Sequence, residues 1–262
     1  QGRYVEETIR SVADQDYPRV EHIVVDGGST DGTLEILGRY PQVRWTSEPD
    51  EGQADAIAKG FRHAKGAILA WLNSDDLYLP GAIAAAVEAL SREPCGLVYG
   101  GWRQIDEHGA TLKDVPAKPW DYPMLLEQAN FVPQPSSFFT REAYETVGGI
   151  DTRYRYAMDH DLWLRIGARF EVCPLDRLLA AFRYHPESKS VAESDAFAWE
   201  VVQTSRRNGG RRLSPYYLDY YLPRRRPHVY RALLATRLLR KGDVPGLFHA
   251  ARRRRSGKLP PT

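Results

Sequence analysis

Two neighbouring carboxylates, Asp75 and Asp76, follow a short apolar run at residues 67–72. Adjacent carboxylates repel each other, and a divalent cation that bridges them to phosphate oxygens stabilises their charged forms. Mg²⁺ and Mn²⁺ prefer hard oxygen ligands and keep coordination positions open for a diphosphate. With Asn73 just before the pair, this segment predicts a metal and phosphate site. The alternative is structural, because Asp76 also stands where it could cap a following helix.

A glycine-rich segment, residues 26–33, follows a second short apolar run at residues 22–25. Glycines let a backbone approach a ligand closely, and nearby hydroxyl and carboxylate oxygens can accept hydrogen bonds from a base or a ribose. The predicted nucleotide contacts are Asp26, Gly28 and Ser29. An ordinary strand-to-helix turn, capped by one of its own polar residues, has the same pattern, so this segment alone is weak evidence.

A third group of acids, Asp159 and Asp161, flanks His160 at the start of an amphipathic run. A carboxylate at a helix N-terminus is a candidate general base, which would draw a proton from an acceptor hydroxyl. Helix capping explains the same pattern, and taken alone it is the better interpretation.

These residues need a scaffold that brings them together, and the pattern of apolar runs predicts one. Short runs rich in β-branched residues alternate with helical patterns, which favours an open, mostly parallel α/β sheet with helices on both faces. Ligands bind such sheets beyond the carboxyl ends of the strands, where Asp26 and Asp75 fall. The expected strands are residues 22–25, 43–45, 67–72 and 97–99, and the expected helices are residues 3–15, 34–37, 54–64 and 80–91.

Several segments, in the same order along the chain, closely resemble glycosyltransferase family 2, which has the GT-A fold. The resemblance covers residues 1 to about 200, and several segments in register are far more specific than any one alone. They are VVDGGSTDGT (24–33), SEPDEGQADA (47–56), WLNSDDLYLPG (71–81), QPSSFF (134–139), GGID (148–151), DHDLW (159–163) and RYHPESKS (183–190).

The resemblance implies a role for each acid on the donor side. Asp26 would contact the nucleotide base, and Asp55 would help to seat the nucleotide. Asp75 would be the metal ligand of the family's D-x-D-type motif, with Asn73 and Asp76 beside the donor. The implied cofactor is Mg²⁺ or Mn²⁺, and the implied donor is a UDP-sugar, with dTDP- and GDP-sugars as alternatives.

The resemblance also implies an inverting reaction, which is a single in-line displacement. Asp159 would be the catalytic base, with Asp161 as second candidate, and the metal at Asp75 would neutralise the departing diphosphate. His185 stands where some relatives place a late phosphate or metal contact, and a structural role is its alternative. The implied acceptor is a growing glycan or a lipid-linked sugar.

Three positions depart from the family pattern. Gly27 stands where many relatives carry a second acid, so base recognition would rest on Asp26. Asn73 occupies the first D-x-D position, which leaves Asp75 as the main charged ligand. Met158 replaces the Glu often found before the base. The family also opens with an apolar strand in the middle of its sheet, and this sequence begins just after that point, so we expect that strand to be missing.

Composition and charge divide the chain into two parts. Hydrophobic residues make up 42% and charged residues 27%, which excludes a disordered chain. We expect a catalytic domain over residues 1–204 and a basic, mainly helical extension over residues 205–262, with a linker at 206–212. Residues 224–262 hold twelve Lys and Arg against one acid, whereas the preceding residues hold 24 basic and 33 acidic side chains.

A basic extension suits an anionic partner. Its apolar residues have mostly helical spacing, which predicts a helix lying on an anionic membrane surface; the alternative packs them onto the catalytic domain. A nucleic-acid-binding module is the non-enzyme alternative, and the acidic body opposes it. The apolar residues of the extension are Val229, Leu233, Leu234, Leu238 and Leu239.

The rival enzyme class is a sugar-phosphate nucleotidyltransferase. Such an enzyme should carry a glycine-rich loop with a basic residue just after its first strand, and no such loop is visible in this sequence.

The two cysteines, Cys95 and Cys173, lie far apart without a partner motif. We expect them to be buried free thiols in a reducing compartment. No run approaches the roughly 18 apolar residues of a membrane-spanning helix. The sequence therefore predicts a cytoplasmic protein, peripheral at the inner face of the cell membrane.

Overall fold

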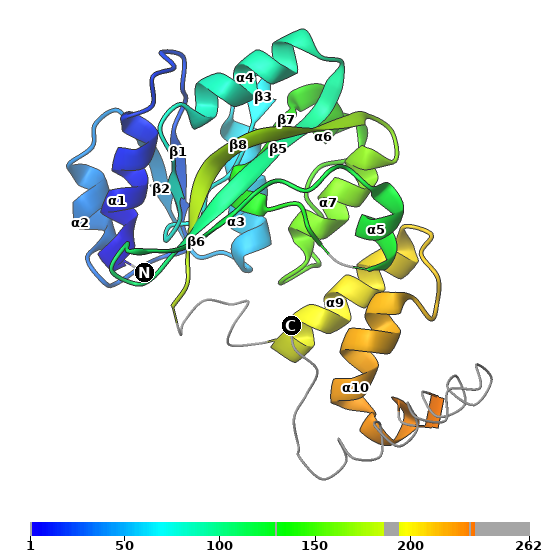
Figure 1. The fold of residues 1–262 in the computed structure, drawn as a ribbon. Coiled ribbons are helices and arrows are strands. Elements are labelled where there is room, and N and C mark those ends of the chain that lie inside the picture. The colour runs from blue at the N-terminus through cyan, green and yellow to red at the C-terminus, as the bar shows by residue number, and fades with distance from the viewer. Residues whose placement is uncertain (1, 129, 186–193, 231, 234–262) are drawn as a thin grey trace.

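The computed structural model describes residues 2–128, 130–185, 194–230 and 232–233. Its strands and helices form the α/β arrangement shown in Figure 1. Seven α-helices and one short 3-10 helix, Gln134–Ser136, accompany the strands up to residue 167, within the described ranges. The α-helices are α1 (Gly2–Ala13), α2 (Thr33–Gly38), α3 (Gln53–His63), α4 (Ala82–Arg92), α5 (Tyr122–Glu127), α6 (Arg141–Thr146) and α7 (Met158–Gly167).

In the part of the chain that the structure describes, the strands form two sheets. β1 (Ile23–Asp26) pairs in parallel with β2 (Arg44–Ser47). The larger sheet has six strands in the order β3-β7-β5-β8-β4, and β6 adds to β5. Its strands are β3 (Ile68–Leu69), β4 (Leu77–Tyr78), β5 (Cys95–Ile105), β6 (Thr111–Val115), β7 (Ser137–Thr140) and β8 (Glu171–Arg183).

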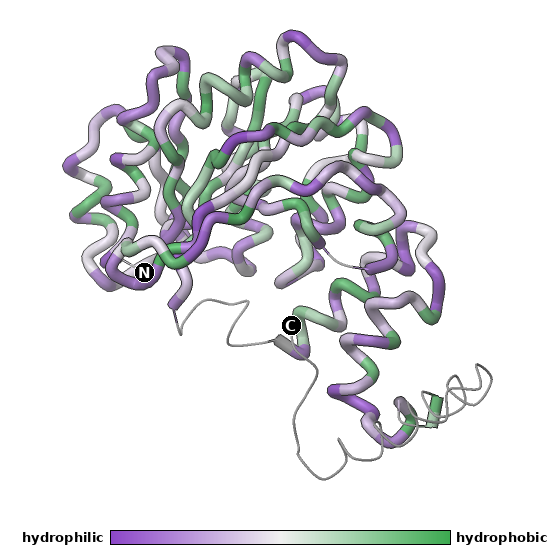
Figure 2. Tube along the Cα trace, viewed as in Figure 1, coloured by the Kyte–Doolittle hydropathy of each residue, from purple (hydrophilic) through white to green (hydrophobic). Residues whose placement is uncertain are grey.

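The two faces of β5 explain why helices cover both sides of the larger sheet. Successive side chains of a strand point to opposite faces. Leu97 and Tyr99 pack in one apolar cluster with residues of α3 and α7, whereas Val98 packs in another with residues of α4. Figure 2 shows hydrophobic residues along these central strands. The predicted α/β fold with helices on both faces is therefore confirmed.

The larger sheet is mixed rather than mostly parallel. β5 runs parallel to β8 but antiparallel to β6 and β7, and β4 runs antiparallel to β8. β5 and β6 are joined by a tight turn, in which the amide of Gly109 donates to the carbonyl of Asp106. Two strands joined by so short a turn are necessarily antiparallel, and the apolar pattern of the strands does not encode their direction.

The predicted strand at residues 67–72 pairs over only two residues, Ile68 and Leu69, and only with β7. Beyond this strand lies a cavity of about 1290 Å³. Its apolar walls include Val24 and Val25 of β1 as well as Ile68 and Leu69. Within the described residues no strand joins β1 to β3. The expectation of a missing first strand stays a prediction.

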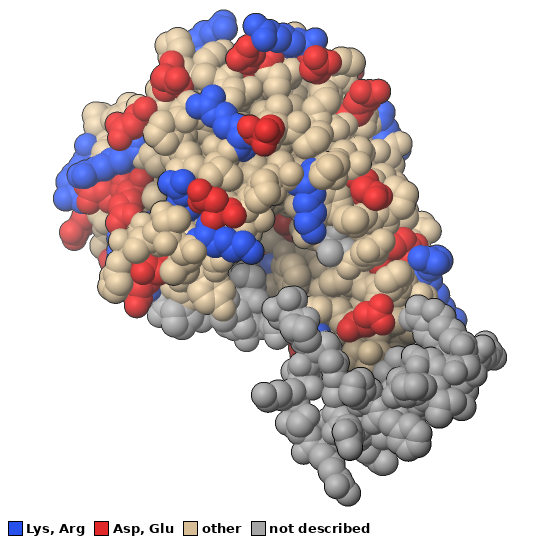
Figure 3. Space-filling view, in the orientation of Figure 1, with Lys and Arg blue, Asp and Glu red and all other residues tan. Residues whose placement is uncertain are grey.

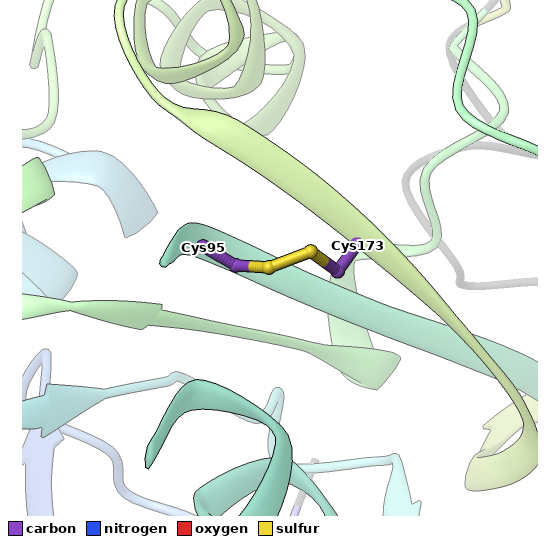
Figure 4. Close-up of a disulfide and its surroundings, with 2 residues drawn as sticks. All are labelled: Cys95 and Cys173. Carbon is purple, nitrogen blue, oxygen red and sulfur yellow. A yellow bond between two sulfur atoms is a disulfide. The ribbon is translucent and has the colours of Figure 1, made fainter. Parts of the chain in front are cut away.

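The expectation for the cysteines was wrong, because Cys95 and Cys173 form a disulfide between β5 and β8 (Figure 4). Their Cα atoms lie 6.1 Å apart, although the residues are 78 positions apart in sequence. The parallel register pairs Cys95 with Glu171 and Val98 with Cys173, which places the two thiols diagonally across neighbouring strands. Sequence spacing alone does not reveal such a register.

The C-terminal region begins with α9 (Ser194–Arg207), which runs across the expected domain boundary at 204/205 and through the first residues of the expected linker. Ala198, Val201 and Val202 of α9 are buried. A π-helical turn, η2 (Tyr217–Tyr221), and α10 (Leu222–Arg225) follow. The apolar residues predicted from Leu234 onward lie outside the described residues. Among the described helices, none is long and apolar enough to span a bilayer.

Candidate active site

The loop between β3 and β4 carries Asp75 and Asp76, and two other elements hold it in place. Thr8 of α1 donates its hydroxyl to the backbone carbonyls of Ser74, at 2.9 Å, and Asp76, at 2.8 Å. From β8, Arg183 donates its Nε to the carbonyl of Asp75 at 3.0 Å. The loop is therefore held through its backbone, by contacts that do not use the carboxyl group of Asp75.

Asp75 and His185, the two residues predicted at the metal site, lie side by side in the structure. His185 Nε2 lies 3.0 Å from Asp75 Oδ2. Asp75 lines the cavity, whereas His185 is buried behind it with 1% of its surface exposed. The pair therefore presents a carboxylate to the cavity with an imidazole behind it.

Asp76 differs from its neighbour, because it is completely buried and does not line the cavity. Its carboxyl group accepts hydrogen bonds from the amide of Arg183 and from Asn73 Nδ2. Burial, and then the charge of Asp75, raise the pKa of Asp76 well above its usual range. Its place in the structure suits a role in holding the loop rather than direct contact with a ligand.

Asn73 lines the cavity within a small amide network that the sequence did not single out. Gln53 of α3 donates its Nε2 to Asn73 Oδ1 at 2.7 Å. Asn73 Nδ2 in turn donates to Gln134 Oε1 at 3.1 Å, and Gln134 Nε2 donates to the carbonyl of Trp71 at 2.6 Å. Both glutamines also line the cavity. Both glutamines could have been singled out from the sequence, because Gln53 lies in SEPDEGQADA and Gln134 in QPSSFF, two segments that carry the family resemblance.

Asp26 ends β1 and organises the loop that follows it. Its Oδ2 accepts hydrogen bonds from the amides of Gly28, at 3.0 Å, and Ser29, at 2.9 Å, and from Ser47 Oγ at 2.7 Å. Burial opposes ionisation of Asp26, but the hydrogen bonds from Ser29 and Ser47 prevail and lower its pKa. Asp26, Gly28 and Ser29 are not among the described residues that line the cavity.

Asp55, expected to seat the nucleotide, lies in the first turn of α3. Its carboxylate pairs with Lys59 at 3.2 Å, and the amide of Glu51 donates to it at 3.3 Å. It does not line the cavity. Its neighbour on the same turn, Gln53, does, because the two side chains leave the helix about 200° apart.

Asp159 lies in the first turn of α7 and lines the same cavity as Asp75. Asn130 donates its Nδ2 to Asp159 Oδ2 at 3.0 Å, and Asp159 forms no ion pair within the described residues. Burial raises the pKa of Asp159 to about 6. A carboxylate with a raised pKa, held at the wall of a cavity, has the properties of a general base.

Asp161 and His160 are buried in contacts away from the cavity. Asp161 is 4% exposed, pairs with Arg165 at 2.6 Å, and accepts a hydrogen bond from Asn208. The Nε2 of His160 lies 2.8 Å from the carbonyl of Leu125, and burial lowers the pKa of this histidine to about 4. Neither residue lines the cavity. The geometry therefore separates the two candidate bases, with Asp159 at the cavity and Asp161 in a buried ion pair.

Asp75 supplies a carboxylate at the wall of the cavity, a donor that suits a divalent cation. His185 Nε2 stands behind it at hydrogen-bond distance, 3.0 Å from Asp75 Oδ2, and does not line the cavity. No cluster of three or more acidic, His or Cys side chains suited to a metal occurs among the described residues. Such a site would rely on water and on substrate phosphates for its other ligands, as Mg²⁺ sites commonly do.

The sequence model of the family described as "Glycosyl transferase family 2" matches residues 2–147, which is more than half of the chain. The chain belongs to glycosyltransferase family 2. It is therefore an enzyme, a glycosyltransferase, and not the rival nucleotidyltransferase.

Individual relatives agree with this family assignment. The chain is 34% identical over 224 residues to an uncharacterized glycosyltransferase of Mycobacterium tuberculosis, covering 82% of this chain and 84% of that one. It is 32% identical over 114 residues to TuaG of Bacillus subtilis, a glycosyltransferase named for teichuronic acid biosynthesis, covering 42% of this chain and 45% of that protein.

A solved structure of similar shape is that of a mannosyltransferase from Pyrobaculum calidifontis, in complex with GDP-mannose and Mn²⁺. Its TM-score is 0.66 at 24% sequence identity, and the match covers 98% of this chain and 76% of that one. This likeness confirms the predicted GT-A fold for the family 2 chain.

Proposed function

We propose that this family 2 glycosyltransferase moves a sugar from a nucleotide diphosphate to a hydroxyl group of a glycan or lipid-linked acceptor, with inversion at the anomeric carbon. One observation carries the proposal: a single cavity is lined by Asp75, which fits a cation, and by Asp159, which fits a base. A direct displacement needs these two groups, one for the leaving diphosphate and one for the attacking hydroxyl.

Asp159 performs the proton transfer in this mechanism. The acceptor oxygen attacks the anomeric carbon while its proton passes to the carboxylate of Asp159. The bond between the anomeric carbon and the diphosphate oxygen breaks, and its electron pair leaves with the nucleoside diphosphate. Because burial raises the pKa of Asp159 to about 6, the group is ionised near neutral pH and is a stronger base than an exposed aspartate.

Asp75 would hold a divalent cation, Mn²⁺ or Mg²⁺, at the donor diphosphate, with His185 behind it as the second candidate ligand. When bound, the cation supplies positive charge where the leaving group becomes more negative. Carboxylate oxygen suits both ions, whereas an imidazole ligand favours the softer Mn²⁺. The Mn²⁺ bound in the Pyrobaculum mannosyltransferase supports this assignment.

On the donor side we assign the nucleotide to the carboxyl edge of β1. Asp26 orders the Gly28–Ser29 loop, which then contacts the base or the ribose, and Asp55 acts on the nucleotide through the first turn of α3. Asn73, held by its amide network, contacts the donor beside Asp75, and Asp76 acts by holding the loop. The donor is a UDP-sugar in this proposal, with GDP- and dTDP-sugars as the alternatives.

The acceptor we propose is a sugar of a cell-envelope polysaccharide. The similarity to TuaG, which is named for teichuronic acid biosynthesis, supports this class of product. It also suits a basic extension that holds the enzyme near anionic material.

A panel of nucleotide sugars, incubated with the full chain and Mn²⁺, tests the proposal. We expect one donor to be turned over with release of a nucleoside diphosphate, and EDTA to abolish that turnover. Asp159→Asn and Asp75→Ala serve as inactive controls. Release of pyrophosphate, or turnover that survives EDTA, would contradict the proposed reaction.

We also propose that the extension contacts an anionic membrane surface, at the inner face of the cell membrane. In its described part, Leu213, Val229 and Leu233 are exposed large apolar residues beside a series of arginines. On the face shown in Figure 3, by contrast, basic and acidic residues are interspersed. The Cys95–Cys173 disulfide counts against the cytoplasmic part of this assignment, since such bonds persist chiefly in oxidising compartments.

A further inference from the structure

Glu200 of α9 accepts hydrogen bonds from three successive backbone amides. The amide of Arg155 lies 3.0 Å from Oε1, and those of Tyr156 and Ala157 lie 2.7 Å and 2.9 Å from Oε2. Hydrogen bonds to an ionised group are about twice as strong as those between neutral groups. One carboxylate therefore fixes three consecutive peptide units of another segment.

These peptide units lie immediately before α7. Ala157 is the N-cap residue of that helix and makes no side-chain capping hydrogen bond. Amides at a helix N-terminus have no partner within the helix, and an alanine side chain cannot supply one. Glu200 accepts a hydrogen bond from one of these terminal amides, that of Ala157, and from the two amides before it, and its charge also suits the positive end of the α7 dipole.

Two further contacts join α9 and its end to the same region. Arg207 Nη1 donates to the hydroxyl of Tyr154 at 3.1 Å, and Asn208 Nδ2 lies 3.3 Å from Asp161 Oδ1. Phe197 of α9 lines the cavity that Asp159 lines. The sequence on either side of Asp159 is thus held by α9 and the residue that follows it.

We propose that Glu200 is a positioning residue for sugar transfer: it caps α7 from outside that helix and so fixes where the carboxyl group of Asp159 lies in the cavity. This inference rests on the proposed function, in which Asp159 is the base. It also makes α9 part of the active site instead of an appendage, because the geometry of the base depends on a residue 41 positions later in the chain.

Glu200→Gln in the full chain tests this proposal, because the amide has the same shape but only one acceptor oxygen. A misplacement of the order of 1 Å at a reacting group lowers turnover by up to about 10²-fold, so we expect kcat to fall roughly 10- to 100-fold. The KM for the donor and the affinity for the nucleoside diphosphate stay within about twofold of the parent, since the hydrogen bonds of Glu200 go to residues 155–157 and not to the residues assigned to the donor. Because a loss of folded protein would also lower the apparent kcat at unchanged KM, kcat is expressed per folded molecule, counted by nucleoside diphosphate binding.

Asp195→Asn is the matched control, because Asp195 lies on the same helix, has a similar charge, and pairs only with Arg225 among the described residues. Its kcat should equal that of the parent. Amide hydrogen exchange provides a second measurement that needs no substrate. Exchange at residues 155–161 should be faster in Glu200→Gln than in Asp195→Asn.

A parental kcat in Glu200→Gln, or unchanged exchange at residues 155–161, would overturn the inference. If the parent enzyme transfers no sugar from any donor, the proposed function fails, while the exchange measurement still decides whether Glu200 holds this segment. Should Glu200→Gln fail to fold, Glu200→Asp takes its place. This variant keeps the charge but shortens the reach, and the same outcomes are expected.

Discussion

The imidazole of His185 lies 3.0 Å from the carboxylate of Asp75, across 110 positions of sequence. β8 creates this contact, because it carries Arg183 to the backbone of the Asp75 loop and ends two residues before His185. A carboxylate and an imidazole are both common metal ligands, so the first test of this pair is a metal-binding experiment.

Asp75→Ala should abolish Mn²⁺-dependent binding of the nucleoside diphosphate while the domain still folds, because a carboxylate ligand at the cavity is lost. His185→Gln should weaken that binding by roughly 10- to 100-fold, a range typical of losing one supporting group of a metal site. Isothermal titration with and without Mn²⁺ measures both. His108→Gln, at an exposed histidine, is the control, and undiminished metal-dependent binding in Asp75→Ala would refute the assignment.

Asp159→Asn should leave donor binding nearly intact and lower kcat by roughly 10²-fold or more, the scale expected for a general base. Asp161→Asn should act differently, because it breaks the buried pair with Arg165. Loss of one partner of such a pair costs about 3 kcal/mol or more, so a lower melting temperature is expected. If Asp161→Asn instead loses turnover while remaining stable, the base is Asp161.

The pH profile should report Asp159 as well. Its pKa is raised to about 6, and the base acts only when ionised, so kcat/KM for the acceptor should fall as the pH drops below about 6. A profile that stays flat down to pH 5 would show that this carboxylate is not the base.

The same raised pKa has the opposite sign for stability. A carboxyl group whose pKa is higher in the folded state than in the unfolded state favours folding when protonated, and that contribution is lost as the pH rises through 6. Asp159→Asn should therefore raise the melting temperature at pH 7.5, by roughly 2–4 °C for each kcal/mol relieved. At pH 4 the gain should disappear, and an equal gain at both pH values would contradict the buried charge.

Reduction of the Cys95–Cys173 bond should destabilise the enzyme. The bond closes a loop of 78 residues, for which chain entropy predicts about 4.5 kcal/mol of stabilisation. Denaturant unfolding with and without a reductant measures this difference. The double variant Cys95→Ser with Cys173→Ser is the control, because reductant should not change its unfolding midpoint.

The basic extension should bind anionic vesicles. Each basic residue near such a surface contributes about 1 kcal/mol, so several together give measurable binding that high salt removes. Sedimentation with phosphatidylserine-containing vesicles compares the full chain with a chain that ends at residue 226. Equal binding of the two chains, or binding that high salt does not reduce, would refute membrane contact through this segment.

Local pattern was sufficient for most elements near the site. The β-branched run at 22–25 and the helical spacing at 54–64 correspond to β1 and α3. The apolar run at 67–72 predicted too long a strand, because hydrophobicity records burial and not the presence of a pairing neighbour. The direction of the strands next to β5 and the cysteine pairing depend on register between distant segments, which no local pattern carries.

The site was predictable to a similar extent. Asp75 was identifiable because it follows an apolar run, and Asp159 because it begins an amphipathic one. Asn130 and Glu200 carry no such signal, since an isolated amide or a glutamate within a helix is ordinary in any sequence. Their roles come from tertiary contacts with Asp159 and with the amides before it.

Because β8 pairs with β4 on one side and β5 on the other, the contact between Asp75 and His185 depends on the alignment of three strands. Tyr78 lies opposite Ala180, and Ala180 lies opposite Trp102. Inserting one residue between Ala180 and Arg183 would advance the end of the strand by about 3.3 Å and turn every later side chain to the opposite face. His185 would then leave Asp75 without any change in its own identity. Length variation in this strand is therefore as damaging to the site as substitution of a ligand.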